Sequence, residues 1–142
     1  MWRKLDNIVL NIRTYADLSP DISIRRRINQ AMGSRPTRTS EDWYRSFWQP
    51  LSISKDLTFF VYQQMESYSG LEFAKVTPSD RLTEDLQLPL VCWFDWEYHL
   101  CDDFHDHFGV EIGDCLDVSM LHTVRDLVIF LNQQLYRSIA DA

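Results

Sequence analysis

The sequence predicts an all-α fold, and three observations support this prediction. Apolar residues recur every three or four positions in several separate segments, which is the spacing of amphipathic helices. Serine or threonine stands before several of these segments and glycine stands after them, as is typical of helix caps. No stretch of alternating apolar and polar residues is long enough to predict a strand. The chain is therefore expected to fold as a bundle of helices.

Two helices are expected near the amino-terminal end. The first covers residues 2–15, and the second covers residues 20–32, with Ser19 as its N-cap, Pro20 at its first position and Gly33 as its stop. Each helix has an apolar stripe that needs a partner. The stripes consist of Trp2, Leu5, Ile8, Val9 and Ile12 in the first helix, and of Ile24, Ile28 and Met32 in the second.

Residues 34–40, SRPTRTS, have the composition of a linker. A short helix is expected over residues 40–48, and it has to end before Pro50 because proline restricts the residue that precedes it. A longer helix follows, with Ser54 as its N-cap and Gly70 as its stop. The apolar faces of these two helices consist of Trp43, Phe47 and Trp48, and of Leu57, Phe60, Val61, Met65 and Tyr68.

A long connection and two more helices complete the expected fold. The connection covers residues 71–91, and the next helix covers residues 92–108 and is closed by Gly109. The last helix begins at Thr123, which forms a T-x-x-D capping box with Asp126. The side chains expected to hold the connection and the last helix in the core are Val76, Leu82, Leu86 and Leu88, and Val124, Leu127, Val128, Leu131 and Leu135.

Length and composition indicate one main domain with an appended segment. The 142 residues include 45% hydrophobic residues and nineteen aromatics, which is enough for a packed core. We divide the chain into a basic segment at residues 1–38 and a helical bundle at residues 39–142. No apolar run approaches the length of a membrane span, and polar residues interrupt any signal-peptide core. With an odd number of cysteines and no CxxC pair, the chain is expected to be a cytoplasmic protein with reduced, mostly buried thiols.

Charge is distributed unevenly along the chain. Residues 1–45 hold nine of the fourteen basic side chains and five acidic ones, a net charge of +4. Residues 46–142 hold five basic and sixteen acidic side chains, a net charge of −11. The two parts can attract each other, or each can attract a partner. The basic run Arg25–Arg27 has no interleaved aromatics and an acidic remainder behind it, so no nucleic-acid partner is predicted.

Three short motifs give the chain a family resemblance. They are SDRLTEDL at residues 79–86, FGVEI at 108–112 and TVRDLVIFL at 123–131. In this order and spacing they make residues 54–137 resemble an acyl carrier protein. The resemblance implies a bundle of three long helices and one short helix, crossed by a long first loop. It also implies a phosphopantetheine arm on a serine at the start of the second long helix, where that family binds its partners.

The chain departs from the family at the attachment site. The family's spacing leads to Phe94 when counted back from Phe108, and to Leu90 when counted forward from the first motif, and neither has a hydroxyl. No serine or threonine lies between Thr83 and Ser119, and the nearest nucleophile is Cys92. We therefore expect a carrier-like fold with no covalent prosthetic group and no other cofactor. The alternative is a genuine carrier or accessory protein of acyl, fatty-acid or polyketide metabolism, modified at an unusual site.

The segment CWFDWEYHLCDDFHDHFGVEI, residues 92–112, holds the candidate functional residues. On a helix, His99, Asp103 and His107 share one face, and two imidazoles with a carboxylate could bind zinc. Three ligands spread over two turns diverge along the axis, however, so a solvated acidic face is the simpler interpretation, and no metal ligand is assigned. Nothing near the cysteines indicates an activated thiolate, and no catalytic residue is assigned.

The aromatic residues at the start of the same segment favour a binding surface. Trp93, Phe94 and Trp96 point in three directions around a helix, so they cannot all face one core. We expect them to form a partner-binding surface together with the acidic residues Asp95, Asp102, Asp103 and Asp106. The predicted function is a non-enzymatic interaction or adaptor module. Its partner is expected to be a protein with a basic surface, the chain's own basic segment, or a second copy in a homodimer.

Overall fold

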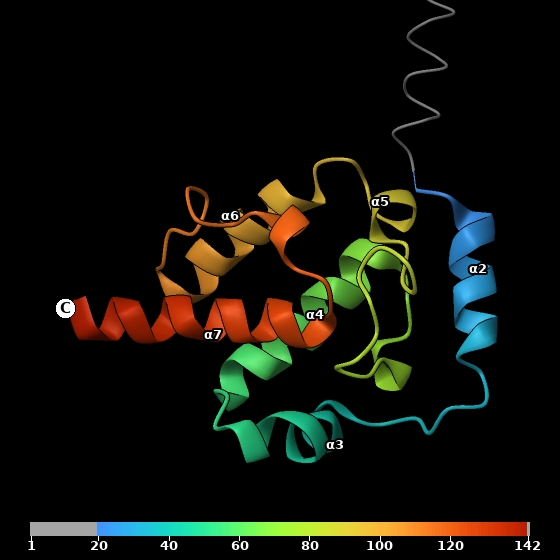
Figure 1. Ribbon diagram of the computed structural model, residues 1–142, viewed down its shortest axis with the longest axis horizontal. Helices are drawn as coiled ribbons and strands as arrows, with labels where there is room; N and C mark the ends of the chain where they lie inside the picture. Colours follow the sequence, from blue (N-terminus) through green and yellow to red (C-terminus); the bar gives the residue numbers. More distant parts are fainter. Residues whose placement is uncertain (1–19, 142) are drawn as a thin grey trace, which may run out of the picture.

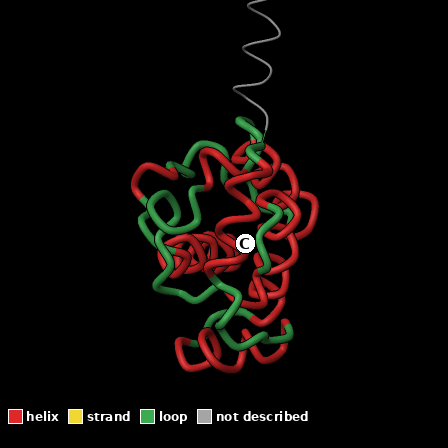
Figure 2. Tube along the Cα trace, turned by 90° about the vertical axis from the view of Figure 1, so that its right-hand side faces the viewer, coloured by secondary structure: helices red, strands yellow, loops and turns green. Residues whose placement is uncertain are grey.

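The computed structural model describes residues 20–141, and this part of the chain consists of helices and loops with no strand (Figures 1 and 2). The prediction of an all-α fold is confirmed. The expected helix at residues 2–15 lies outside the described residues. The elements are α2 (Ile22–Ala31), α3 (Ser40–Trp43), the π-helix η1 (Tyr44–Trp48), the 3₁₀ turns η2 (Gln49–Leu51), η3 (Phe73–Lys75) and η4 (Val118–Met120), α4 (Lys55–Ser69), α5 (Leu88–Val91), α6 (Trp96–Phe108) and α7 (Val124–Asp141).

Helix α2 begins two residues later than expected. Its N-cap is Asp21, whose Oδ1 accepts a hydrogen bond from the backbone N–H of Ile24 at 3.1 Å, so the assignment of Ser19 as N-cap and Pro20 as first helical residue is wrong. The expected stripe is correct: Ile28 and Met32 are buried, and Ile24 packs against them. Arg25 turns inward, because its Nε donates to the carbonyl of Val91 at 2.8 Å.

The short aromatic helix has the expected bounds, because α3 and η1 together cover residues 40–48. Thr39 caps α3 by accepting from the N–H of Asp42, and the chain then widens into η1 and tightens into η2. Pro50 lies in the separate turn η2, after η1 has ended at Trp48, so the prediction that the helix ends before Pro50 is confirmed. A proline early in a helical turn costs no hydrogen bond, because the first N–H groups have no acceptor there. Trp43 and Trp48 are fully buried on this segment.

Helices α4 and α7 form the centre of the bundle. Ser54 caps α4 by accepting from Leu57 N–H, and Gly70 ends it in the left-handed conformation at φ 68°, both as predicted. A Cβ at Gly70 would lie 2.9 Å from the Arg25 side chain, which is a second reason for glycine there. The two helices are also joined by Asn132 on α7, whose side-chain oxygen accepts from Ser54 N–H at 3.1 Å.

The capping box of α7 is present as predicted. Asp126 accepts from the N–H groups of His122 and Thr123 at 3.0 and 3.1 Å, and the Thr123 hydroxyl accepts from Asp126 N–H at 3.2 Å. The long connection crosses to this point and forms one antiparallel bridge, between Arg81 and Thr123. The side chains expected to hold the connection, Val76, Leu82, Leu86 and Leu88, are all buried.

Helix α6 starts four residues later than the predicted residue 92. The chain first forms the separate turn α5, which ends where the N–H of Cys92 donates to the carbonyl of Leu88. Cys92 itself is extended, with φ −92° and ψ 161°, and buried, so the helix is interrupted before it restarts at Trp96. Gly109 closes α6 at φ 72°, as predicted.

One hydrophobic core joins the helices α2, α3, α4, α5, α6 and α7 with η1 and η3. The buried side chains of α2, Ile28 and Met32, belong to the same cluster as those of the bundle, including Leu86, Leu100 and Leu131. The division into residues 1–38 and 39–142 stays a prediction, although α2 shares the core of the second part. Within residues 20–141, no helix has both the length and the apolarity that crossing a membrane requires.

Candidate functional site

The break between α5 and α6 places the predicted aromatic residues in different surroundings. Trp93 and Phe94 lie in the turn that precedes α6, and Trp96 is the first residue of the helix. Trp96 is turned into the core and is only 5% exposed, so it offers a partner little contact area. The inward stripe of α6 consists of Trp96, Leu100 and Phe104.

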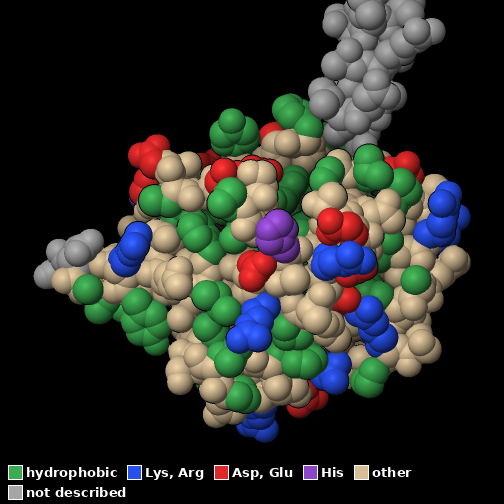
Figure 3. Space-filling view, viewed as in Figure 1, with side chains coloured by type: hydrophobic (Ala, Val, Ile, Leu, Met, Phe, Trp, Pro, Cys, Tyr) green, Lys and Arg blue, Asp and Glu red, His purple; other side chains and the backbone are tan. Residues whose placement is uncertain are grey.

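Three aromatic side chains are exposed around this turn, and we call them the aromatic patch: Trp93, Phe94 and Tyr98. Their exposed fractions are 41%, 64% and 76%. In the space-filling view, hydrophobic side chains project along the upper edge of the molecule, over the start of α6 (Figure 3). Neighbouring exposed aromatics on an otherwise polar surface are typical of an interaction site.

The aromatic patch borders two adjoining hollows. One has a volume of about 350 Å³ and is lined by Phe94, Tyr98 and Cys101 among others. The second, of about 250 Å³, is lined by Trp93, Phe94 and the buried Trp96. Phe94 and Glu97 belong to both linings, so Phe94 forms the ridge between them. A partner could therefore place one side chain in each of the two hollows, on either side of the Phe94 ring.

Three carboxylates surround the first hollow, and we call them the acidic rim: Glu97, Asp102 and Glu111. Burial raises the pKa of Glu97, and the nearby charge of Asp117 raises it further. The pKa of the Cys101 thiol is also raised, first by burial and then by the charges of Glu111, Asp102 and Glu97. No lysine or arginine within residues 20–141 pairs with the acidic rim, so its negative potential is available to a basic partner.

The other predicted acidic residues lie apart from the aromatic patch or have partners of their own. Asp95 lies 3.3 Å from His99 Nε2. Asp103 accepts a hydrogen bond from the hydroxyl of Tyr68 on α4, and this bond, after burial, raises the pKa of that tyrosine. Asp106 is exposed but lines a different hollow, together with Phe60 on α4. Of the four predicted carboxylates, Asp102 is the one that shares a hollow with Phe94.

The possible metal ligands are not brought together. His99 contacts Asp95, Asp103 contacts Tyr68, and His107 Nε2 lies 3.2 Å from Asp56 on α4. Across the part of the chain that the structure describes, no three histidine, cysteine or acidic side chains are grouped so as to hold a metal ion. The geometry therefore gives the zinc interpretation no support.

The cysteine nearest to the expected attachment site is inaccessible. Cys92 is 2% exposed, and burial raises the pKa of its thiol to about 12. A thiol with this pKa is protonated at neutral pH and is a poor nucleophile. Cys115, which is exposed, lies in the loop between α6 and η4.

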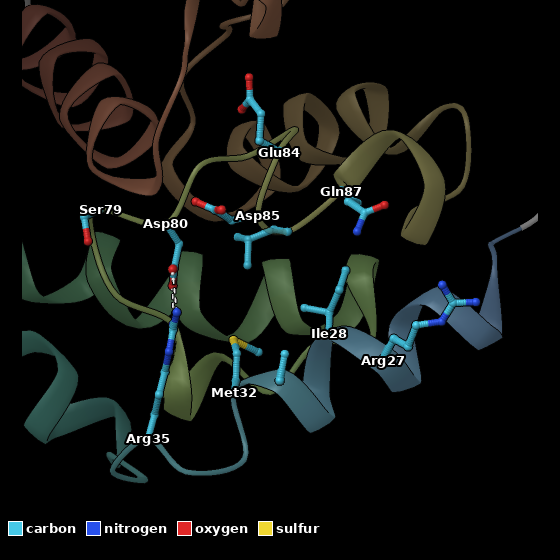
Figure 4. Close-up of a pocket in the computed structure, with 11 residues that line it drawn as sticks. Arg27, Ile28, Met32, Arg35, Ser79, Asp80, Glu84, Asp85 and Gln87 are labelled. Atoms are coloured by element: carbon cyan, nitrogen blue, oxygen red, sulfur yellow. Dashed lines mark hydrogen bonds and ion pairs between the residues drawn. The ribbon is translucent and has the colours of Figure 1, made fainter.

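A hollow with a volume of about 550 Å³ lies elsewhere, between α2 and residues 79–87 (Figure 4). Arg35 spans one end of it and donates to both carboxylate oxygens of Asp80, at 2.7 and 3.0 Å. Asp85 is bound by Arg81 outside the hollow, and Glu84 points away from α2 in the close-up. The charges of Asp80 and Asp85 are thus neutralised by Arg35 and Arg81. We therefore consider this hollow a weaker candidate for a binding site than the aromatic patch.

Sequence reasoning missed three residues of the surface: Tyr98, Glu97 and Glu111. Tyr98 follows Phe94 by four positions, which was a usable signal because residues four apart in a helix are neighbours. Glu111 lies beyond the end of α6, and only the folding of the loop after Gly109 brings it beside Asp102. No local pattern could have shown that contact.

No protein-family model matches the chain, and neither does any curated protein or any solved structure.

Proposed function

We propose that the chain is a non-enzymatic interaction module that binds a basic protein segment through the aromatic patch and the acidic rim. The observation that carries the proposal is the exposure of Phe94 and Tyr98 beside carboxylates that form no ion pair within residues 20–141. Large rigid rings supply contact area at low cost in side-chain entropy, and carboxylates speed the approach of a basic partner. The same arrangement lacks the paired acid, base or nucleophile that a reaction would need.

We further propose that the module has an acyl-carrier-like arrangement. The order of α4, a long crossing connection, α6, the short helix η4 and α7 supports this likeness. In such an arrangement the start of α6 corresponds to the place where carriers of that family bear their arm and meet their partners. Here Trp93 and Phe94 occupy this place, which supports recognition by contact in place of recognition through an arm.

The alternative, a carrier modified at an unusual residue, has less support. Its nearest acceptor is Cys92, and this thiol is buried and protonated at neutral pH. Incubating the purified protein with a phosphopantetheinyl transferase and coenzyme A, followed by intact mass spectrometry, tests this alternative directly. We expect no added mass, and a phosphopantetheine adduct would contradict the proposal.

The binding surface is tested with matched pairs of variants. Phe94→Ser alters the aromatic patch, and Tyr136→Ser changes an equally exposed aromatic on α7. Asp102→Lys reverses a charge in the acidic rim, and Asp106→Lys makes the same change on the α4 side of α6. Proteins captured from source cells by the wild-type chain are identified, purified and titrated against all four variants.

The proposal expects a selective loss of affinity. Phe94→Ser and Asp102→Lys should each weaken binding by about tenfold or more, as truncation of a central contact does, and raised salt should weaken it further. Tyr136→Ser and Asp106→Lys should bind like the wild type. Equal binding by all five proteins would contradict the proposal.

A further inference from the structure

The described chain begins beside α5, the turn that precedes the aromatic patch in the sequence. The backbone N–H of Asp21 donates to the carbonyl of Leu90 at 2.8 Å, which fixes the start of α2 against α5 (Figure 1). Ile22 and Leu90 are both exposed at this point, and Trp93 and Phe94 follow Leu90 within four residues. The first described residues therefore lie against α5, which leads into the turn that carries Trp93 and Phe94.

The preceding residues are long enough to cover that surface. Residues 16–19 can span at most about 13 Å when extended. Residues 2–15, as an amphipathic helix, would be about 21 Å long. A helix of this length has about four turns, which is long enough to present its apolar stripe to several side chains of a surface.

The same residues are complementary to the surface in character. Their apolar stripe, Trp2, Leu5, Ile8, Val9 and Ile12, has to be covered if the helix is to be stable in water. Residues 2–15 also carry Arg3, Lys4 and Arg13 against a single acid, Asp6. The stripe fits the exposed rings, and the excess of positive charge fits the acidic rim.

We propose that residues 2–15 bind the aromatic patch of their own chain, so that the module covers its own interaction surface until a stronger partner displaces the segment. This inference rests on the proposed function, because it assigns an occupant to the same surface. A short tether favours the same chain over a second copy, since it holds the segment at an effective concentration on the order of millimolar. An external partner has to compete with that concentration.

Limited trypsin digestion of the full chain tests the inference. Docking shields the bond after Arg13, and cleavage follows the population of the open form. The rate of cleavage after Arg13 is measured by intact mass for the wild type, Phe94→Ser and Tyr136→Ser, while light scattering gives the molecular mass. We expect monomers, with cleavage about tenfold slower in the wild type and Tyr136→Ser than in Phe94→Ser.

Two results would overturn the inference. One is an equal rate in the wild type and Phe94→Ser, whether fast or slow, because the segment would then be free or protected independently of the patch. The other is a dimer whose protection disappears on dilution, because the occupant would then be a second copy. If cleavage is equal but Phe94→Ser still weakens an external partner, this inference alone fails, whereas loss of both effects removes the proposed function as well.

Discussion

The ion pair between Arg35 and Asp80 should hold α2 and the long connection together, and its removal gives a calculable loss of stability. Asp80 is 5% exposed, and its carboxylate accepts two bonds from Arg35 and one from the N–H of Thr77 at 2.8 Å. Arg35 also donates to the carbonyl of Lys75 at 3.1 Å. Arg35→Met keeps the apolar stem but leaves a nearly buried carboxylate with one donor.

The expected cost of Arg35→Met is about 2–3 kcal/mol. Each hydrogen bond to a charged group contributes roughly 1.5–3 kcal/mol. The total for the bonds between Arg35 and Asp80 has to be reduced, because the Arg35 side chain is 36% exposed and water can replace some of these bonds. Arg26→Met, which removes an exposed charge from α2, should cost no more than about 0.5 kcal/mol.

The assay is urea unfolding of Arg35→Met, Asp80→Asn and the double variant, monitored by far-ultraviolet circular dichroism. The free energies of unfolding are compared with the same m-value for all proteins. Because both side chains belong to one interaction, the double variant should lose at least about 1 kcal/mol less than the two single losses combined. Strict additivity, or a stability for Arg35→Met within about 0.5 kcal/mol of the wild type, would refute the reasoning.

Three further results are expected. Trp43→Phe should cost about 1–3 kcal/mol more than Trp48→Phe in urea unfolding, because Trp43 Nε1 donates to the buried carbonyl of Val76 at 2.8 Å whereas Trp48 Nε1 is buried without an acceptor in the described chain; equal costs would contradict this. Asp126→Asn should destabilise the protein at neutral pH, because backbone hydrogen bonds, first from His122, lower the pKa of Asp126. This contribution to stability is present above the pKa of Asp126 in the unfolded state and is lost as pH falls through its pKa in the folded state. The difference in free energy of unfolding between Asp126→Asn and the wild type should therefore become smaller below about pH 4, and a difference that stays constant would contradict this prediction. A thiol reagent at pH 7 should modify Cys115 much faster than Cys92, as read by peptide mass spectrometry, because Cys92 is buried with a pKa of about 12; comparable rates would show that this burial is wrong.

Local signals in the sequence were sufficient for the helices whose ends depend on neighbouring residues. Ser54, Gly70, Gly109 and the Thr123 capping box act within one turn of the backbone, and each is where the sequence placed it. The apolar stripes of α4 and α7 could also be predicted from the sequence, because in a long helix the apolar residues that recur at helical spacing are the ones that are buried.

Contacts between distant residues explain what the sequence could not show. Cys92 interrupts the helix because it is buried beside α5, which depends on the packing of the whole connection. That break decides whether Trp93 or Trp96 faces the core, and so it also changes the membership of the binding surface. The Arg35–Asp80 pair joins residues 45 positions apart, and no spacing rule indicates such a pair.

Photo-cross-linking from the patch is the most direct test of the central claim that this surface acts by contact. Benzoylphenylalanine replaces Phe94 in one variant and Tyr136 in a second, and both are irradiated in source cells. The account predicts a discrete adduct from position 94, either to one protein or to residues 2–15 of the chain, and none of that kind from position 136. Indistinguishable products from the two positions, or no product from position 94, would contradict it.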